Sequence, residues 1–301
     1  MYRVILVPVD GSPFGERALS LAIPVAEQHG ARLVLLHVHQ LPLPITAVGG
    51  GAPVRDPALD HHLREDRRKY LERLATRLRG ETAVAIEPVF RDGPVIATIE
   101  SFVREAGIDL IVMPTHGRGG FGRFWLGSVA EGLLRRVPAP LLLVRAGRSG
   151  GSPRPTAAPP FTRILVPLDG SPLAERAVAE VQKLVGSAPA HLTLAHVVHS
   201  SLVAISRLGV PKGDYLPRVM YLEPLAERLR SERLTVSTEA VVHTIVHRAL
   251  LGLAKRDGTD LIAIASQGRG GFQRLLLGSV ADKLIRSATL PLLVCAGPGP
   301  T

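Results

Sequence analysis

The chain has 301 residues, of which 46% are hydrophobic and 21% charged. This composition is that of a globular protein with a sizeable core, which excludes a largely disordered chain, and the length favours two domains. A single cysteine, Cys295, excludes an internal disulfide framework and a zinc site built on cysteines.

The formal net charge is +10, from 36 Lys and Arg against 26 Asp and Glu. The excess is spread along the chain, because residues 1–146 have 18 basic and 15 acidic side chains and residues 161–301 have 16 and 11. No base-reading motif accompanies this charge, so we do not expect nucleic acid as a partner. The first residues lack the pattern of a secretory signal, and no apolar stretch has the ~18–20 residues of a membrane span. We therefore expect a cytoplasmic protein without a membrane partner.

Short apolar runs rich in Val, Ile and Leu alternate with stretches of helical periodicity. Residues 18–26 and 63–78 place apolar side chains three or four apart, as on one helix face. Continuous apolarity is typical of strands buried on both faces of a parallel sheet. The predicted strands are residues 3–9, 32–38, 83–90, 109–113 and 140–145, and then 163–168, 191–198, 234–242, 260–265 and 291–296. This alternation predicts an α/β protein with two doubly wound, Rossmann-like domains, each an open five-stranded parallel sheet with helices on both faces.

The second half of the chain repeats the first. The blocks at 4–13, 33–38, 109–113, 117–121 and 126–130 recur in the same order at 163–172, 192–197, 260–264, 268–272 and 277–281. The duplication predicts domains at residues 1–146 and 161–297, joined by a linker at 147–160 that is rich in Gly, Ser and Pro. Residues 47–57, which include three consecutive glycines, are predicted to form a loose insertion.

The turn after the first predicted strand reads Asp10-Gly11-Ser12-Pro13, and its repeat reads Asp169-Gly170-Ser171-Pro172. Gly, Ser and Pro in this order are typical of a turn, a helix N-cap and a first helical residue. The Asp is less well explained, because the Ser already caps the helix. A carboxylate at a strand end can accept hydrogen bonds from an adenine amine or a ribose hydroxyl. A structural role and a ligand-binding role therefore stay open for both Asp residues.

A glycine-rich segment follows the fourth predicted strand in each half. Gly117 and Gly127 are ten residues apart, and so are Gly268 and Gly278. Ser128 to Glu131 has the pattern of a capping box that opens a helix, and Ser279 repeats it. A helix N-terminus offers phosphate its free amide donors and the positive end of the helix dipole. The alternative is a plain helix cap beneath a loop that binds nothing.

Motifs for cleaving phosphates or esters are missing from the sequence. It has no Gly-Lys-Ser/Thr of a P-loop, no Gly-x-Gly-x-x-Gly opening the first helix, and no nucleophile elbow. The glycine-rich segments can hold phosphates, but no residue is an evident catalyst.

Taken together, these motifs resemble the universal stress protein family in its tandem two-domain form, over nearly the whole chain. Nucleotide-binding members of that family carry Gly-x-x-Gly-x₉-Gly-Ser/Thr after the fourth strand and an Asp after the first. The resemblance implies an adenine nucleotide alpha hydrolase-like fold and ATP as the ligand, with or without Mg²⁺. Adenine and ribose would meet the Asp and a Val after the second strand, and phosphates would meet amides of the glycine segment. The implied site residues are Pro8, Asp10, Val38, Met113, Gly117, Arg118, Gly127, Ser128 and Val129, and in the second half Pro167, Asp169, Val197, Ile264, Gly268, Arg269, Gly278, Ser279 and Val280.

Both halves depart from the family pattern at its first glycine, where Pro114 and Ala265 stand instead. Ala265 keeps its amide hydrogen, whereas Pro114 has none to donate. Loss of one hydrogen bond to a charged group weakens binding roughly ten- to a hundred-fold. We therefore expect ATP binding in the first half to be weakened but not excluded.

Three functions are weighed on this sequence. The first is a universal stress protein that binds ATP or a related adenine nucleotide as a regulatory module in the stress response, with slow ATP hydrolysis at most. The second is a nucleotide-free dimerisation and interaction scaffold of the same fold, in which Pro114 and Ala265 disable the phosphate loop. The third, a hydrolase or transferase, needs an acid, base or metal set that the sequence does not show.

The sequence also supports expectations about the pairing of the domains, four histidines and the single cysteine. The resemblance implies that the domains pair through their last strands, 140–145 with 291–296, and it allows a homodimer. His37 and His196, at matching positions, are predicted to be hydrogen-bonded residues near strand ends. His243 and His247 are four apart and could share a helix face, but without a third ligand we expect a solvated or capping role and no metal site. Cys295 is predicted to lie in the core.

Overall fold

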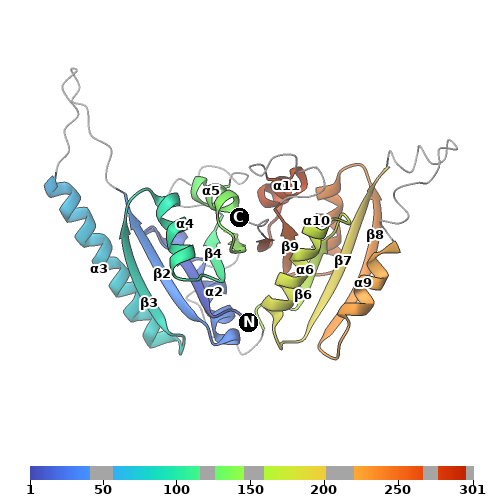
Figure 1. The fold of residues 1–301 in the computed structure, drawn as a ribbon, viewed down its shortest axis with the longest axis horizontal. Helices are drawn as coiled ribbons and strands as arrows, with labels where there is room; N and C mark the ends of the chain where they lie inside the picture. Colours follow the sequence, from blue (N-terminus) through green and yellow to red (C-terminus); the bar gives the residue numbers. More distant parts are fainter. Residues whose placement is uncertain (41–56, 116–125, 146–158, 201–219, 267–276, 296–301) are drawn as a thin grey trace, which may run out of the picture.

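The computed structural model describes residues 1–40, 57–115, 126–145, 159–200, 220–266 and 277–295 (Figure 1). Most of the predicted linker and of the loose insertion lies outside these residues, as do Gly117, Arg118, Gly268 and Arg269. Among the described residues, no helix is long and apolar enough to cross a membrane.

Strands and helices alternate along both halves of the chain. The first half contains β1 (Val4–Pro8), α1 (Pro13–Glu16), α2 (Leu19–His29), β2 (Arg32–His39), α3 (Pro57–Glu81), β3 (Ile86–Asp92), α4 (Val95–Glu105), β4 (Leu110–Pro114), α5 (Ser128–Arg136) and β5 (Leu141–Val144). The second half contains β6 (Arg163–Pro167), α6 (Pro172–Val185), β7 (Ala190–His199), α9 (Leu222–Leu229), β8 (Leu234–His243), α10 (Val246–Arg256), β9 (Leu261–Ala265), α11 (Ser279–Ser287) and β10 (Leu292–Cys295). Every predicted strand is present, with ends that differ by up to three residues.

The strands form one ten-stranded sheet with the order β3-β2-β1-β4-β5-β10-β9-β6-β7-β8. Within each half all neighbouring strands are parallel. One face of the sheet packs against α2, α3, α6 and α9, and the other, which we call the second face, packs against α4, α5, α10 and α11. Figure 1 shows α3 and α9 at the two far ends and β4 and β9 towards the middle. The doubly wound α/β fold is therefore confirmed, with a switch point between β1 and β4 and another between β6 and β9.

The two halves meet through β5 and β10, which pair antiparallel, so the expected contact between the last strands is present. Leu143, Leu142 and Leu141 lie opposite Leu292, Leu293 and Val294. All residues of both strands are buried, including Cys295, which lies in the core as predicted. Burial raises the pKa of the Cys295 thiol far above its ordinary value, which keeps it protonated.

A helix end in the second half is capped by side chains from the first. The last carbonyls of a helix have no partner within the helix. The Gln28 side-chain amide lies 2.9 Å from the Leu184 carbonyl oxygen and 2.7 Å from that of Val185, and donates to both. The Nε2 of His29 lies 2.9 Å from the same Leu184 oxygen. The C-terminus of α2 thereby holds the C-terminus of α6 across the junction.

Charged groups connect the start of the chain to the same helix. The Asp109 carboxylate accepts hydrogen bonds from the amides of Arg3 and Val4, at 2.8 and 3.1 Å, and lies 3.6 Å from the Lys183 ammonium. Burial alone would raise the pKa of Asp109, but these amides and the lysine charge together lower it. The Lys183 nitrogen also lies 4.5 Å from the centre of the Tyr2 ring, so Lys183 contacts the first half twice.

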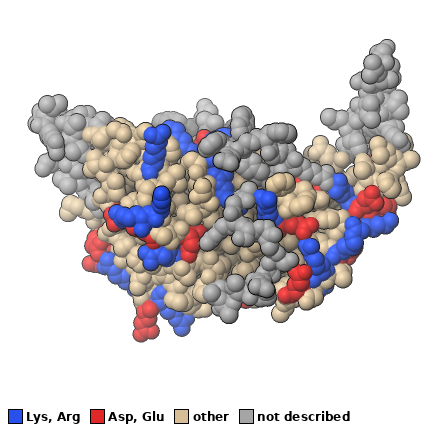
Figure 2. All heavy atoms as spheres, turned by 180° about the vertical axis from the view of Figure 1, so that it is seen from behind, with Lys and Arg blue, Asp and Glu red and all other residues tan. Residues whose placement is uncertain are grey.

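Basic and acidic side chains lie among one another on the face that Figure 2 shows. Opposite charges also lie one turn apart on single helices of the protein, as in the pairs Arg104–Glu100 and Arg286–Asp282. Exposed pairs of this kind contribute little to stability, typically about 0–1 kcal/mol each. The halves are therefore held together by the buried contacts described above.

The Gln28 cap can be tested by Gln28→Ala. The substitution leaves the Leu184 and Val185 carbonyls without the amide donor, and we expect the free energy of unfolding in urea to fall by about 1–3 kcal/mol. Gln182→Ala is the matched control, because Gln182 is exposed on α6 and makes no side-chain hydrogen bond within the described chain; its effect should stay within about 0.5 kcal/mol. An equal loss in both variants would show that the cap does not stabilise the junction.

The Asp109 contacts predict a pH dependence. A carboxyl with a lowered folded-state pKa stabilises the fold above its unfolded pKa of about 4, and this contribution disappears as the pH falls through the folded pKa. Asp109→Asn should therefore be less stable than the native protein at pH 7, and the difference should narrow below about pH 4. Glu105→Gln, at an exposed carboxyl at the end of α4, should show no such narrowing in the same urea series.

Candidate functional site

Three apolar side chains lie side by side at the carboxyl edge of the first-half sheet. Pro8 ends β1, Val38 lies near the end of β2 and Met113 near the end of β4, and β1 separates the other two strands. Alternation along the strands places all three on the second face, where Met113 and Val38 pack with the core. In the second half Pro167, Val197 and Ile264 occupy the same positions. Each half therefore offers a partly buried apolar surface at its switch point.

A carboxylate stands directly beside this surface. The Asp10 Oδ1 accepts hydrogen bonds from the Ser12 amide at 2.9 Å and from the Ser12 hydroxyl at 2.6 Å. Ser12 in turn accepts from the Gly15 amide and is the N-cap of α1, as predicted. The structural role of Asp10 is thus real, because its carboxylate closes the turn. Its Oδ2 accepts no hydrogen bond from the described residues.

The turn is tightly constrained in both halves. Gly11 and Gly170 have φ of +77° and +78°, a backbone conformation that residues other than glycine rarely adopt. A Cβ on Gly15 would lie 2.8 Å from the Asp10 Oδ1, so α1 passes close over the carboxylate. In the second half the Asp169 Oδ1 accepts from the Ser171 amide at 2.9 Å.

The predicted histidines position the same turn. The Nδ1 of His37 lies 2.8 Å from the Val9 carbonyl oxygen, one residue before Asp10. The Nδ1 of His196 lies 2.8 Å from the Leu168 carbonyl oxygen, one residue before Asp169. Both rings are buried, and both hold the backbone that leads into the carboxylate. The prediction of hydrogen-bonded histidines near strand ends is confirmed.

The predicted capping box is wrong by one residue. Gly127 is the N-cap of α5 and Gly278 that of α11, and neither helix has a side-chain cap. Ser128 and Ser279 are therefore the first helical residues, and their side chains are exposed. A serine at this position cannot reach back to cap the helix.

A backbone contact closes the base of each glycine-rich segment. The Gly127 amide donates to the Thr115 carbonyl oxygen at 2.8 Å, and the Gly278 amide donates to that of Ser266, also at 2.8 Å. The Gly127 and Gly278 amides are thus already hydrogen-bonded within the protein. At the start of α5, the amides of Ser128, Val129 and Ala130 have no acceptor among the described residues. A glycine at the N-cap has no side chain, so it would let a ligand come close to the start of the helix even though its own amide is already bonded.

The structure brings most of the sequence-predicted site residues to one edge in each half. Pro8, Asp10, Val38, Met113, Gly127, Ser128 and Val129 share that edge, as do Pro167, Asp169, Val197, Ile264, Gly278, Ser279 and Val280. Gly117, Arg118, Gly268 and Arg269 lie outside the described residues. Sequence reasoning missed Thr115 and Ser266. Both are hydroxyl residues that directly follow the fourth strand of their half, a signal that alignment of the two repeats contains.

The idea that His243 and His247 share a helix face is wrong. His243 ends β8, whereas His247 lies in the first turn of α10. The Nδ1 of His243 accepts from the Ile245 amide at 2.8 Å, just before α10 begins, and α10 itself has no side-chain cap. Within the described ranges, no three His, Cys, Asp or Glu residues gather as a metal site.

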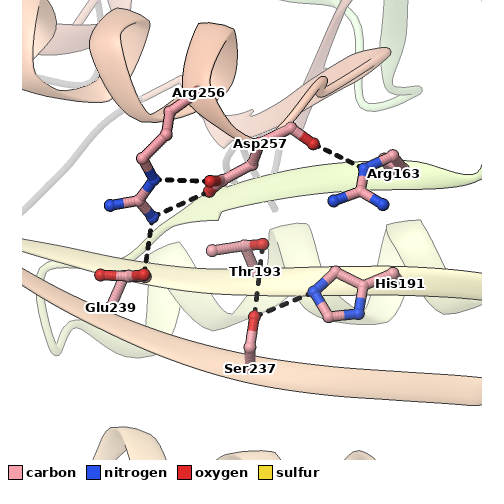
Figure 3. A network of polar contacts seen from close by, with 7 residues as sticks. All are labelled: Arg163, His191, Thr193, Ser237, Glu239, Arg256 and Asp257. Carbon is pink, nitrogen blue, oxygen red and sulfur yellow. Dashed lines mark hydrogen bonds and ion pairs between the residues drawn. The ribbon is translucent and has the colours of Figure 1, made fainter.

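A Ser–His pair lies elsewhere on the second half, between β7 and β8 (Figure 3). The Nε2 of His191 lies 3.0 Å from the Ser237 Oγ. Its Nδ1 lies 2.9 Å from the Thr235 hydroxyl, where a catalytic triad would have a carboxylate. The nearby Asp257 and Glu239 carboxylates are instead bonded to Arg256. This network links the sheet to α10 and does not form a triad.

The arrangement at each switch point combines three chemical features. An apolar surface suits a flat ring, a carboxylate at its rim suits hydroxyl or amine donors, and open amides at a helix N-terminus suit an anion. These features fit an adenine nucleotide, because it carries a flat base, a sugar and phosphates. For Mg²⁺, the described residues supply no dedicated ligand cluster.

Comparisons with known proteins agree with this fold. The sequence model of the universal stress protein family matches residues 1–145 and 160–296. A universal stress protein of Mycolicibacterium smegmatis is 28% identical over 306 residues, which cover 96% of each chain. One from Thermus aquaticus is 34% identical over 152 residues, which cover 48% of this chain and 100% of its own. The crystal structure of a universal stress protein from Archaeoglobus fulgidus superposes with a TM-score of 0.71 at 21% identity, covering 97% of this chain and 98% of its own, and it supports the fold.

The family match covers both repeats and leaves out little more than the segment between them. The relative from Mycolicibacterium smegmatis spans both repeats as well. The chain therefore belongs to the universal stress protein family, in its tandem form.

Proposed function

We propose that this protein binds an adenine nucleotide, ATP above all, and acts as a regulatory binding module in the stress response. The observation that carries the proposal is the meeting, in each half, of an apolar surface, a carboxylate and open helix amides at one switch point. The glycine spacing, which resembles that of the nucleotide-binding members of the family, supports the same ligand.

The base and sugar would occupy the apolar end of the site. Pro8, Val38 and Met113 provide a surface on which an adenine ring can lie. The Asp10 Oδ1 is engaged in the turn, so the Oδ2 would accept from a ribose hydroxyl or the adenine amine. His37 would act indirectly, by holding the carbonyl of the residue before Asp10.

The phosphates would meet the start of α5 or α11. Each helix presents open amides and an exposed serine hydroxyl at its first turn. Hydrogen bonds to a charged oxygen are about twice as strong as those between neutral groups. The helix dipole adds about 0.3–1 kcal/mol for an anion at this end.

The two halves would differ in affinity. Pro114 pairs with Val144 at the end of β4, and Ala265 pairs with Cys295 in the matching position of β9. A proline has no amide hydrogen, whereas the alanine keeps one. The second half is therefore the stronger candidate for ATP.

Binding, and not turnover, is the proposed activity. The Asp10 and Asp169 carboxylates are bonded within their turns, and His37 and His196 contact backbone carbonyls. A general base must reach the attacking group, and none of these four side chains is set up to do so. The nucleotide-free scaffold remains the competing function, favoured by Pro114 and by the extensive junction between the halves.

Titration calorimetry on protein stripped of co-purified ligand tests the proposal. We expect one strong ATP site per chain, lost in Gly278→Val because the added side chain blocks close approach to α11. Gly127→Val should leave that strong site intact. Gly80→Val is the control, since a Cβ at Gly80 meets nothing within 4 Å.

Two other results are informative. Two strong ATP sites per chain would mean that the first half tolerates Pro114. No heat and no thermal stabilisation at millimolar ATP would overturn the proposal and make the scaffold the better explanation. Thermal melting of each variant separates loss of binding from loss of the fold.

A further inference from the structure

Arg145 lies beside the base of the first glycine-rich segment. It directly follows β5, whose last residue, Val144, pairs with Pro114 at the end of β4. The Thr115 amide donates to the Val144 carbonyl oxygen at 3.0 Å, and the Thr115 carbonyl accepts from Gly127, the N-cap of α5. Arg145 is thus one strand away from the residue that joins β4 to the start of α5.

The charge of Arg145 has no acidic partner in the described part of the chain. The side chain is half-buried, and its Nε donates to the Ala288 carbonyl oxygen at the end of α11. No ion pair joins it to a described carboxylate, and the sequences that follow Thr115 and Arg145 in the chain, 116–125 and 146–158, contain no Asp or Glu. Burial lowers the pKa of Arg145, with no carboxylate to offset that effect.

The surroundings of Arg145 differ from those of Lys183, another cation at the junction. Lys183 is also partly buried, but the Asp109 carboxylate lies 3.6 Å from its ammonium. A partly buried charge without an opposite charge costs free energy, and a bound anion would recover that cost. The remaining guanidinium N–H groups of Arg145 are suited to such an anion, because an arginine carries five donors in a planar fork.

Comparison of the two repeats connects Arg145 with Pro114. Val144 pairs with Pro114 in the first half, and Cys295 pairs with Ala265 in the second. The residue after Val144 is Arg145, whereas the residue after Cys295 is Ala296. The half with Pro114 therefore carries a cation directly after β5, whereas the half that keeps the amide has an alanine at the matching position.

We infer that Arg145 is a ligand-binding residue of the first half, a cation that contacts the anionic part of the ligand where Pro114 offers no amide. This inference rests on the proposed function for the identity of the ligand, a phosphate-bearing adenine nucleotide. The contact between Nε and Ala288 would hold the guanidinium in place while its terminal nitrogens face the anion. Arg145 would also join the first site to α11, whose other end is the phosphate-binding end of the second site.

The test uses the full chain with the second site blocked by Gly278→Val. In this background we expect Arg145→Met to weaken ATP binding by about ten- to a hundred-fold. Adenosine binding should change less than about twofold, because adenosine has no phosphate. Arg145→Lys should recover part of the lost ATP affinity, since lysine keeps the positive charge but not the planar set of N–H donors. Arg73→Met, at an exposed arginine on α3 on the opposite face, is the control for net charge.

A structural role alone predicts a different pattern. If Arg145 only caps α11, Arg145→Met will lower the melting temperature and leave the ratio of ATP to adenosine affinity unchanged, which would overturn the inference. An unchanged affinity for both ligands would overturn it as well.

A second probe separates this inference from the proposed function. Inorganic triphosphate should raise the melting temperature of the Gly278→Val protein, and Arg145→Met should abolish that rise. If triphosphate acts through Arg145 but no nucleotide binds, the proposed function fails and the anion role of Arg145 stands. If neither triphosphate nor nucleotide acts through Arg145, the inference fails.

Discussion

Two four-residue strands, β5 and β10, carry the apolar sequences Leu-Leu-Leu-Val and Leu-Leu-Val-Cys and are buried on both faces. An edge strand of this kind exposes unpaired backbone groups and invites association with other chains. Antiparallel pairing of β5 with β10 satisfies those groups within one molecule. The same pairing places like faces of the two half-sheets on the same side, so that each layer of helices continues across the junction. Each candidate site lies at the switch point of its own half, between β1 and β4 or between β6 and β9.

Three side chains of the first half contact backbone carbonyls of the second half around the paired strands. Gln28 and His29 of the first half cap α6 of the second, and Arg145 of the first half donates to the end of α11. In each of these contacts the first half supplies the side chain and the second half supplies the carbonyl. Pro114 also lies in the first half, where it removes a donor from the candidate site. Lys183 of the second half supplies a side chain in the other direction, towards Asp109 and Tyr2, and the second half also keeps the amide that Pro114 lacks.

Much of this architecture could be predicted from the sequence. The continuous Val, Ile and Leu runs and the repeated Asp-Gly-Ser-Pro turn adopt structures that depend mainly on residues close together in the sequence. The residue at which α5 begins could not be predicted in this way. Ser128 to Glu131 has the right residues for a capping box, but the Gly127 amide is bound by the Thr115 carbonyl, which moves the N-cap back by one residue. His243 and His247 show the same limit, since a spacing of four predicts a shared face only if both residues are helical. Contacts between distant segments, such as Arg145 with Ala288, leave no mark in local spacing.

Duplication within one chain also removes a constraint that a symmetric dimer would impose. In a two-fold homodimer every substitution appears twice, so a change that weakens one site weakens both. In this tandem chain, a substitution in one repeat leaves the other repeat unchanged. Gly132 on α5 leaves no room for a side chain against Ile96 of α4, whereas Lys283 and His247 stand at the matching positions of α11 and α10. Burial, and then the charge of Lys283, lower the pKa of His247, a group that the first half lacks at this position. Pro114 with Arg145, against Ala265 with Ala296, is a second such divergence, and it lies at the site itself. Unequal repeats are thus the expected result when two copies of one fold share a chain, and the differences between the repeats mark positions where the two candidate sites no longer match.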